Sequence, residues 1–133
     1  MHSAANLFSR EITRHFDSYF EELNLSTSYV ELLLILFERE EVSQNDLAEE
    51  MKLAPSTITR FVNKLVKKGL VEKKKVGRTA VITLSPEGEE LTPTLKQSFE
   101  NAVNDLKSIL GNKFVYTTKE LLLHGSNLLK EKE

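Results

Sequence analysis

Apolar residues recur every three or four positions along most of this chain, which is typical of amphipathic helices. The first such stretch is formed by Leu7, Ile12, Phe16, Tyr19, Phe20 and Leu23. The next, from about Ser28 to Phe37, is apolar on almost every side and predicts a buried core helix. We therefore expect a mainly helical protein packed around one central helix.

The middle of the chain carries the signals of two consecutive helices. Ser43 has an acid three residues later, with Val42 and Leu47 at the flanking staple positions, which predicts a short helix from Gln44 to Met51. Pro55 suits the first position of a helix because its missing N–H costs nothing there. This next helix is predicted to run to Lys68 and to stop at Gly69.

From Leu70 the period changes from helical spacing to an alternation of two. Residues 71–75 alternate in this way, and 79–84 read as a returning β-branched strand. The segment Val76-Gly77-Arg78 between them predicts a tight turn, and hence a β-hairpin.

Two further helices are predicted at the C-terminal end. Ser85-Pro86-Glu87 marks the start of a long helix ending near Gly111, and Pro93 inside its early turns is expected to kink it or delay its start. A capping box formed by Thr117 and Glu120 predicts that the last helix begins there and covers 121–129.

A helix, a short helix, a sharp turn, a second helix and a hairpin make a winged helix-turn-helix. The predicted fold class is therefore mainly α with a small β-hairpin wing, flanked by N- and C-terminal helices. One face of the second helix is apolar and anchors it: Ile58, Phe61, Val62 and Leu65. The outward side and its flanks carry side chains that donate to base edges or phosphates: Ser56, Thr57, Thr59, Arg60, Asn63, Lys64 and Lys67.

The charge of the chain is separated along the sequence. Between Met51 and Thr79 there are nine Lys or Arg and one acid, Glu72, whereas the remaining residues hold 9 basic and 19 acidic side chains. The formal net charge of −2 therefore hides a strongly basic segment on an acidic body. Such a surface is typical of a protein that binds a polyanion on one face.

This pattern predicts double-stranded DNA as the partner. The second helix has the width of a major groove, and no acid occurs from Ala54 to Val71 to neutralise its face. In the hairpin, Arg78 at the tip is expected in the minor groove, and Lys73, Lys74 and Lys75 along the adjacent backbone.

A family resemblance is carried by SQNDLAEEMKLAPSTITRFVNKLVKKGLVEKKK followed by RTAVITLSPEGEEL. This stretch, about residues 43–91, closely resembles the core of MarR-family transcriptional regulators. The resemblance implies a homodimer joined by the first and the last two helices. It places the helix Ala54–Lys68 in the major groove and Arg78 in the minor groove. It also implies repression, as in most members, and release from DNA by a small ligand, as in many.

The chain departs from the family pattern at two places. Ala54 stands where the family usually has a capping Ser, and Ala cannot cap, so we expect a loss of about 1 kcal/mol. The family wing is usually longer and contains an Asp–Arg pair, whereas this tip is Val76-Gly77-Arg78.

The flanking helices predict a homodimer. Their apolar stripes are too broad for the central unit to cover, and exposed stripes of that size mark an interface. We expect N-terminal dimerisation (1–27), DNA-binding (28–84) and C-terminal dimerisation (85–133) segments. A two-fold dimer reads a pseudo-palindrome with half-sites about 10 bp apart. A group of aromatic residues near the junction of the dimerisation and DNA-binding segments is a candidate lining of an effector pocket: Phe16, Tyr19, Phe20 and Tyr29. The alternative is that these residues belong to the ordinary core or to the dimer interface.

The sequence argues against several other classes. Zero cysteines exclude disulfides and thiolate metal or redox sites, and the three scattered histidines predict no metal or cofactor. No apolar run reaches membrane-spanning length and no secretory signal is present, so we expect a cytoplasmic protein. Enzyme motifs are missing. A winged-helix protein-interaction module remains the main alternative, and an enzyme with acids in a dimer cleft is a remote one.

Overall fold

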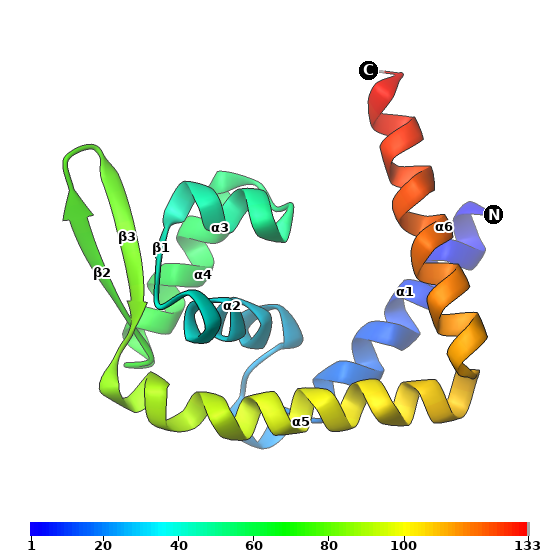
Figure 1. Ribbon diagram of the computed structural model, residues 1–133, viewed down its shortest axis with the longest axis horizontal. Helices are drawn as coiled ribbons and strands as arrows, with labels where there is room; N and C mark the ends of the chain where they lie inside the picture. The colour runs from blue at the N-terminus through cyan, green and yellow to red at the C-terminus, as the bar shows by residue number, and fades with distance from the viewer. Residues whose placement is uncertain (133) are drawn as a thin grey trace.

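The computed structural model describes residues 1–132, and Glu133, the end of the predicted C-terminal segment, lies outside them. The described part contains α-helices and a small antiparallel sheet, as the sequence predicts. In chain order these elements are α1 (His2–Asp17), a 3₁₀ turn (Glu21–Leu23), α2 (Thr27–Arg39), β1 (Glu41–Ser43), α3 (Gln44–Met51), α4 (Pro55–Lys67), β2 (Val71–Val76), β3 (Thr79–Leu84), α5 (Pro86–Leu110) and α6 (Asn112–Glu131). The long α5 forms a base with α2–α4 and the sheet above one end, and α1 and α6 rise at the other (Figure 1).

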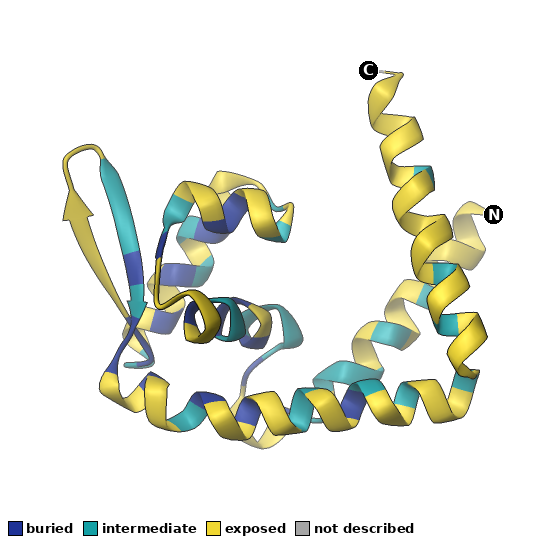
Figure 2. Cartoon of the chain, in the orientation of Figure 1, coloured by how far each residue is buried: buried dark blue, intermediate teal, exposed yellow. Residues whose placement is uncertain are grey.

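The core lies almost entirely in the unit made by α2, α3, α4 and the sheet (Figure 2). The predicted core helix α2 supplies four fully buried side chains: Val30, Leu32, Leu33 and Leu36. Ile58, Val62 and Leu65 of α4 pack into the same core and are also fully buried. At the other end, α1 and α6 contain no buried residue.

The helix-turn-helix forms where its local signals place it. The Ser43 hydroxyl accepts a hydrogen bond from the Asp46 amide at 3.1 Å and caps α3, which spans the predicted residues. The helix α4 begins at Pro55 and ends at Lys67, one residue before the predicted end. Gly69 follows with φ +76°, a left-handed conformation that glycine adopts without strain.

The hairpin is part of a three-stranded sheet with the order β1-β3-β2. The sequence reading missed β1, because three residues carry no periodicity of their own. Val42, predicted as a staple residue, pairs with Ile82 across β1 and β3. On the other side of β3, Val71 pairs with Leu84 and Val76 with Thr79. The short β1 therefore ties the start of α3 to the base of the wing.

The start of α5 is set by a cap and by a close backbone contact. The buried Ser85 hydroxyl accepts from the Gly88 amide at 3.0 Å and donates to the Gly69 carbonyl at 2.5 Å. The helix begins at Pro86, so Pro93 does not delay it. The cap, together with packing of Leu95 and Ala102 in the interior, holds the helix through the proline position.

Two predicted helix boundaries are wrong. The first helix ends at Asp17, not near Leu23, and the following residues turn so that Phe20 enters the core. The last helix starts directly after Gly111, so Thr117 and Glu120 lie inside it and form no capping box. Gly111 has φ +91°, which ends α5 and changes the chain direction, so α6 starts at the next residue.

Candidate nucleic-acid interface

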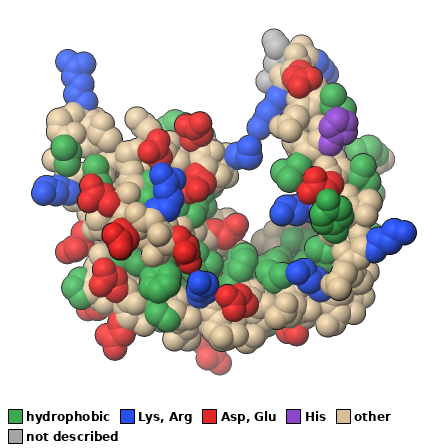
Figure 3. Space-filling view, in the orientation of Figure 1, with side chains coloured by type: hydrophobic (Ala, Val, Ile, Leu, Met, Phe, Trp, Pro, Cys, Tyr) green, Lys and Arg blue, Asp and Glu red, His purple; other side chains and the backbone are tan. Residues whose placement is uncertain are grey.

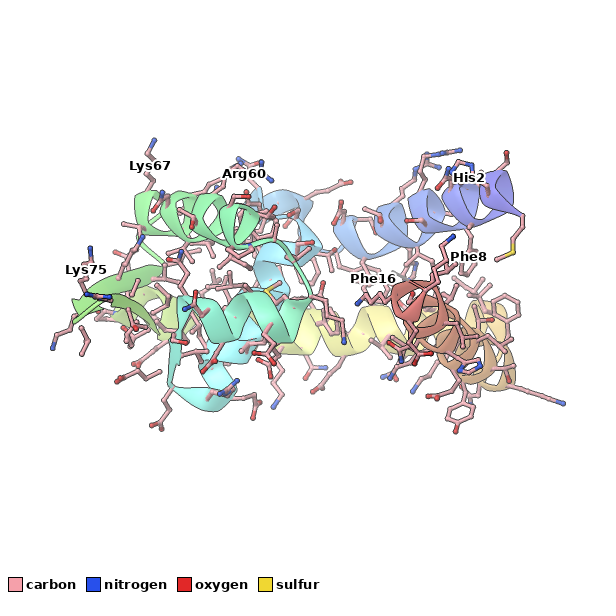
Figure 4. All side chains as sticks on the ribbon, turned by 90° about the horizontal axis from the view of Figure 1, so that it is seen from above. His2, Phe8, Phe16, Arg60, Lys67 and Lys75 are labelled. Atoms are coloured by element: carbon pink, nitrogen blue, oxygen red, sulfur yellow. The ribbon has the colours of Figure 1, made fainter. Side chains whose placement is uncertain are left out.

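The helix α4 is anchored on one side and free on the other. Its buried Ile58, Val62 and Leu65 hold it on the core, and Arg60 and Lys67 project from the side away from α2 (Figure 4). Five of the seven residues predicted for DNA contact are exposed: Ser56, Arg60, Asn63, Lys64 and Lys67. Thr57 and Thr59 are half-buried. The structure thus brings a row of uncharged hydrogen-bond donors and basic side chains onto one accessible face.

Thr59 has a structural task that the sequence does not reveal. Its hydroxyl accepts from the Gln44 amide nitrogen at 2.7 Å and donates to the Pro55 carbonyl at 3.0 Å. Both functions of the hydroxyl are therefore used inside the protein, where they join the start of α3 to the first turn of α4. Thr59 thus positions α4, and its one hydroxyl hydrogen is already engaged by the Pro55 carbonyl.

An aromatic pair supports two basic side chains in the middle of α4. The rings of Tyr29 on α2 and Phe61 on α4 lie 4.5 Å apart between centroids. The Arg60 guanidinium carbon lies 5.8 Å from the Phe61 ring centre, and the Lys64 ammonium nitrogen 5.3 Å from that of Tyr29. Both are within the range of cation–π attraction. The Tyr29–Phe61 pair therefore restricts both cations, and sequence reasoning missed this role.

The start of α4 lacks a side-chain cap, as the sequence predicts. Ala54 occupies the N-cap position with φ −62° and ψ 144° and makes no side-chain hydrogen bond. Its carbonyl accepts from the amides of Thr57 and Ile58 at 3.0 and 3.1 Å. Pro55 at the first helical position removes one of the donors that a cap would otherwise have to satisfy.

The wing is a short hairpin closed by Gly77 and Arg78. Gly77 has φ +63° and Arg78 does not have positive φ, a combination that suits a tight two-residue hairpin turn. All predicted wing residues are exposed: Lys73, Lys74, Lys75 and Arg78. Because side chains alternate along a strand, Lys74 lies on the opposite face of β2 from its two lysine neighbours. The wing therefore offers positive charge on both faces and at its tip.

The structure keeps the charges separated. In the view of Figure 3, acidic side chains gather over the body of the helical unit, while a basic side chain extends from the wing tip. Arg60, Lys64, Lys67 and the wing bases appear in none of the ion pairs of the described residues, which join Arg14 to Glu11, Arg39 to Glu50 and Lys96 to Glu38. The positive charge of this face is thus free to attract an anion.

The predicted aromatic group is divided by the structure. Phe16 and Tyr19 pack against His15, with ring centroids 5.3 and 5.2 Å from its ring. Phe20 is fully buried in the core, and Tyr29 lies under α4. Of the four residues, Phe16 lines a cavity, which lies between α1, α2 and α5.

The polar contacts in this region join α1 to α5. Tyr19 donates a hydrogen bond to the Asp105 carboxylate, and this bond is the main cause that raises the pKa of Tyr19. A ring nitrogen of His15 lies 2.8 Å from the Ala102 carbonyl oxygen. Among residues 1–132, no group of three or more His, Cys, Asp or Glu is arranged to hold a metal ion.

Comparison with known proteins places this arrangement in a family. The model of the MarR family matches residues 25–76. The transcriptional regulator SarZ of Staphylococcus haemolyticus is 30% identical over 127 residues, which cover 83% of this chain and 86% of SarZ. The chain belongs to the MarR family. This family consists of transcriptional regulators, which are not enzymes.

Solved structures of MarR-family proteins share the fold. A MarR variant from E. coli in complex with operator DNA superposes with a TM-score of 0.80 at 18% identity, covering 92% of this chain and 91% of that one. The S. aureus MepR–DNA complex has a TM-score of 0.79 at 18% identity, covering 98% and 97%. The MarR fold thus extends over nearly the whole chain, including α1 and α6. Within residues 1–132 no helix has the length and apolar character needed to cross a membrane.

Proposed function

We propose that this MarR-family regulator binds double-stranded DNA sequence-specifically as a homodimer and represses the genes it controls. The observation that carries the proposal is the exposed, acid-free face of α4, held rigidly by three fully buried side chains on its other side. The DNA complexes of the MarR and MepR proteins, which share the fold, support the same interpretation. Acting on the chromosome would place the protein in the cytoplasm.

The two parts of the basic surface have different tasks in this proposal. Arg60 and Asn63 lie in the middle of the exposed face of α4, where side chains reach base edges in a major groove. The lysines of β2 contact phosphates, and Arg78 enters the minor groove from the turn. Base contacts specify the sequence, whereas phosphate contacts position the protein.

The homodimer is supported by the apolar surface of the two terminal helices. Many large apolar side chains of this region are exposed in the single chain: Leu7, Phe114, Leu121, Leu122, Leu123, Leu128 and Leu129. A surface of this kind on a water-exposed helix needs a partner. A second copy, packing α1 and α6 of both chains together, would give two α4 helices that read half-sites about 10 bp apart.

The alternative is a winged-helix module that binds another protein. The fold alone does not decide between the two. A free basic face without acids favours DNA, because a protein interface is depleted of charge at its centre.

The test begins with selection of a preferred duplex from a random pool, followed by affinity measurements on that duplex and a scrambled one. Arg60→Ala should cost about 1–3 kcal/mol on the selected duplex and little on the scrambled one. Lys74→Ala should weaken both duplexes alike and reduce the salt slope by about one. Equal losses from both substitutions on every duplex would contradict the division of tasks. Failure to select any sequence would favour the protein-interaction alternative.

A further inference from the structure

The middle of α4 carries two positive charges one helical turn apart. Arg60 and Lys64 are four residues apart on the helix, and both side chains are exposed. Like charges at this spacing repel each other. Among residues 1–132 neither side chain takes part in an ion pair, so no carboxylate offsets this repulsion. Any fixed orientation of the two cations must therefore come from neutral neighbours.

The neutral neighbours are the rings of Tyr29 and Phe61. The Lys64 ammonium nitrogen lies 5.3 Å from the centre of the Tyr29 ring, and the Arg60 guanidinium carbon lies 5.8 Å from that of Phe61. The face of an aromatic ring carries negative electrostatic potential and attracts a cation within about 6 Å of its centre. The contact with Tyr29 is the closer of the two. It also comes from α2, so it ties a cation of α4 to another helix.

The Tyr29 ring is itself held in place. Its centroid lies 4.5 Å from that of Phe61, and both rings pack against the core. The next residue, Val30, is fully buried. At the start of α2, the Thr27 amide and hydroxyl donate to the Asp17 carboxylate at 2.8 and 2.6 Å, which fixes the first turn of the helix. The half-buried ring is therefore a fixed surface on which the lysine rests.

A fixed ring changes what a lysine can do at a DNA surface. The ammonium group of a lysine sits on a flexible chain and usually acts as a point charge, which suits phosphates. Restricting the chain before binding removes part of the entropy cost of ordering it in the complex. A lysine held in this way can donate to the O6 and N7 atoms of guanine, as arginine does.

We propose that Tyr29 is a positioning residue for DNA readout, which holds Lys64 so that this lysine selects a guanine in the major groove. Lys64 is then a base-reading residue beside Arg60 and not only a phosphate contact. The inference rests on the function proposed above, because it requires α4 to lie in the major groove. It adds a residue outside α4 to those that determine the preferred sequence.

The test measures affinity for the selected duplex and for a set of duplexes that each change one of its base pairs. For the wild type, a change at a contacted pair should lower affinity about tenfold or more. Lys64→Ala should erase this penalty at one G·C pair. Tyr29→Leu should reduce the penalty at that same pair about three- to tenfold and leave the other penalties unchanged.

Two control variants accompany Tyr29→Leu. Tyr29→Phe keeps the ring and should retain the wild-type pattern of penalties. Phe37→Leu removes an exposed ring from the other end of α2 and should also change no penalty. The double variant Tyr29→Leu with Lys64→Ala should relax the pattern no further than Lys64→Ala alone, because Tyr29 acts through Lys64. A merely structural role of Tyr29 would instead displace α4 and lower all penalties together.

Nuclear magnetic resonance of the protein without DNA tests the contact itself. The protons on the Lys64 carbon next to the ammonium group should resonate upfield of those of Lys67, an exposed lysine of the same helix, because the face of a ring shields protons above it. The upfield shift should persist in Tyr29→Phe and vanish in Tyr29→Leu. Its absence from the wild type would overturn the inference without any variant.

Failure of this inference is distinguishable from failure of the proposed function. A wild type that prefers no duplex would overturn the proposed function, and the assignment of Tyr29 would fall with it. A wild type that discriminates between duplexes, combined with an unchanged pattern in Tyr29→Leu, would overturn the assignment alone. A uniform loss of all penalties in Tyr29→Leu would overturn it as well.

Discussion

The start of the proposed DNA-binding helix offers a stability test that depends on a single atom. Ala54 has the backbone conformation of an N-cap residue but no side-chain oxygen. It is exposed, so a hydroxyl placed there loses no hydration. The substitution Ala54→Ser supplies the acceptor that the first turn of α4 lacks.

The magnitude follows from an equivalent cap elsewhere in the chain. Ser43 has a similar backbone conformation, with φ −69° and ψ 151°, and accepts from the amide three residues later. A serine cap stabilises a helix by about 1 kcal/mol relative to alanine. Ala54→Ser should therefore raise stability by about 1 kcal/mol, or the unfolding midpoint by about 3–5 °C for a chain of this size. Ser43→Ala should lower stability by the same amount.

Thermal unfolding followed by circular dichroism measures both changes, at one fixed protein concentration because dimerisation contributes to stability. Ala4→Ser is the matched control, since it adds the same hydroxyl inside α1, where serine is slightly unfavourable. An unchanged or lowered midpoint for Ala54→Ser would refute the reasoning. It would mean that Pro55 and the Ala54 carbonyl already satisfy the first turn.

Three further predictions concern packing, charge and assembly. Gly88→Ala would place a Cβ 2.1 Å from the Leu70 carbonyl oxygen and should destabilise the protein by at least about 3 kcal/mol in urea unfolding. A Cβ at Gly125 would meet nothing within 4 Å, so Gly125→Ala should stabilise the protein by about 0.5–1 kcal/mol. Equal effects of the two substitutions would contradict the contact at Gly88. Burial raises the pKa of Glu31, so the ionised form of its carboxyl group opposes folding. The stability gain of Glu31→Gln over the wild type should therefore grow as the pH rises through the raised pKa, and it should vanish well below the ordinary value of 4.5. A gain that is constant from about pH 3 to 8 would contradict this reasoning. Leu122→Glu puts a charge on the exposed apolar surface of α6 and should weaken the dimer more than tenfold in sedimentation, and an unchanged profile would exclude α6 from the interface.

Features with strong local signals could be predicted from the sequence almost to the residue. The bounds of α3, the starts of α4 and α5 and the bounds of β3 follow from Ser43, Pro55, Ser85 and the change of period after Leu70. Each of these signals acts within one turn of helix or one pair of strand residues. The separation of charge was visible for the same reason, because it lies in one continuous stretch.

Features that depend on distant contacts could not be predicted. The strand β1 exists because β3 offers it a free edge, 38 or more residues later in the chain. The Thr59 hydroxyl accepts a hydrogen bond from the Gln44 side chain, and no sequence pattern places these two residues side by side. Phe20 turns into the core because α1 ends early, whereas helical spacing had grouped it with Phe16.

The central claim is that the basic face of α4 and the wing reads DNA sequence. Fluorescence anisotropy of a selected labelled duplex and its scrambled counterpart, each at two salt concentrations, tests it most directly. The account predicts tighter binding to the selected duplex at both concentrations and a steep fall of both affinities with salt. Weak, equal binding of the two duplexes with little dependence on salt would contradict it.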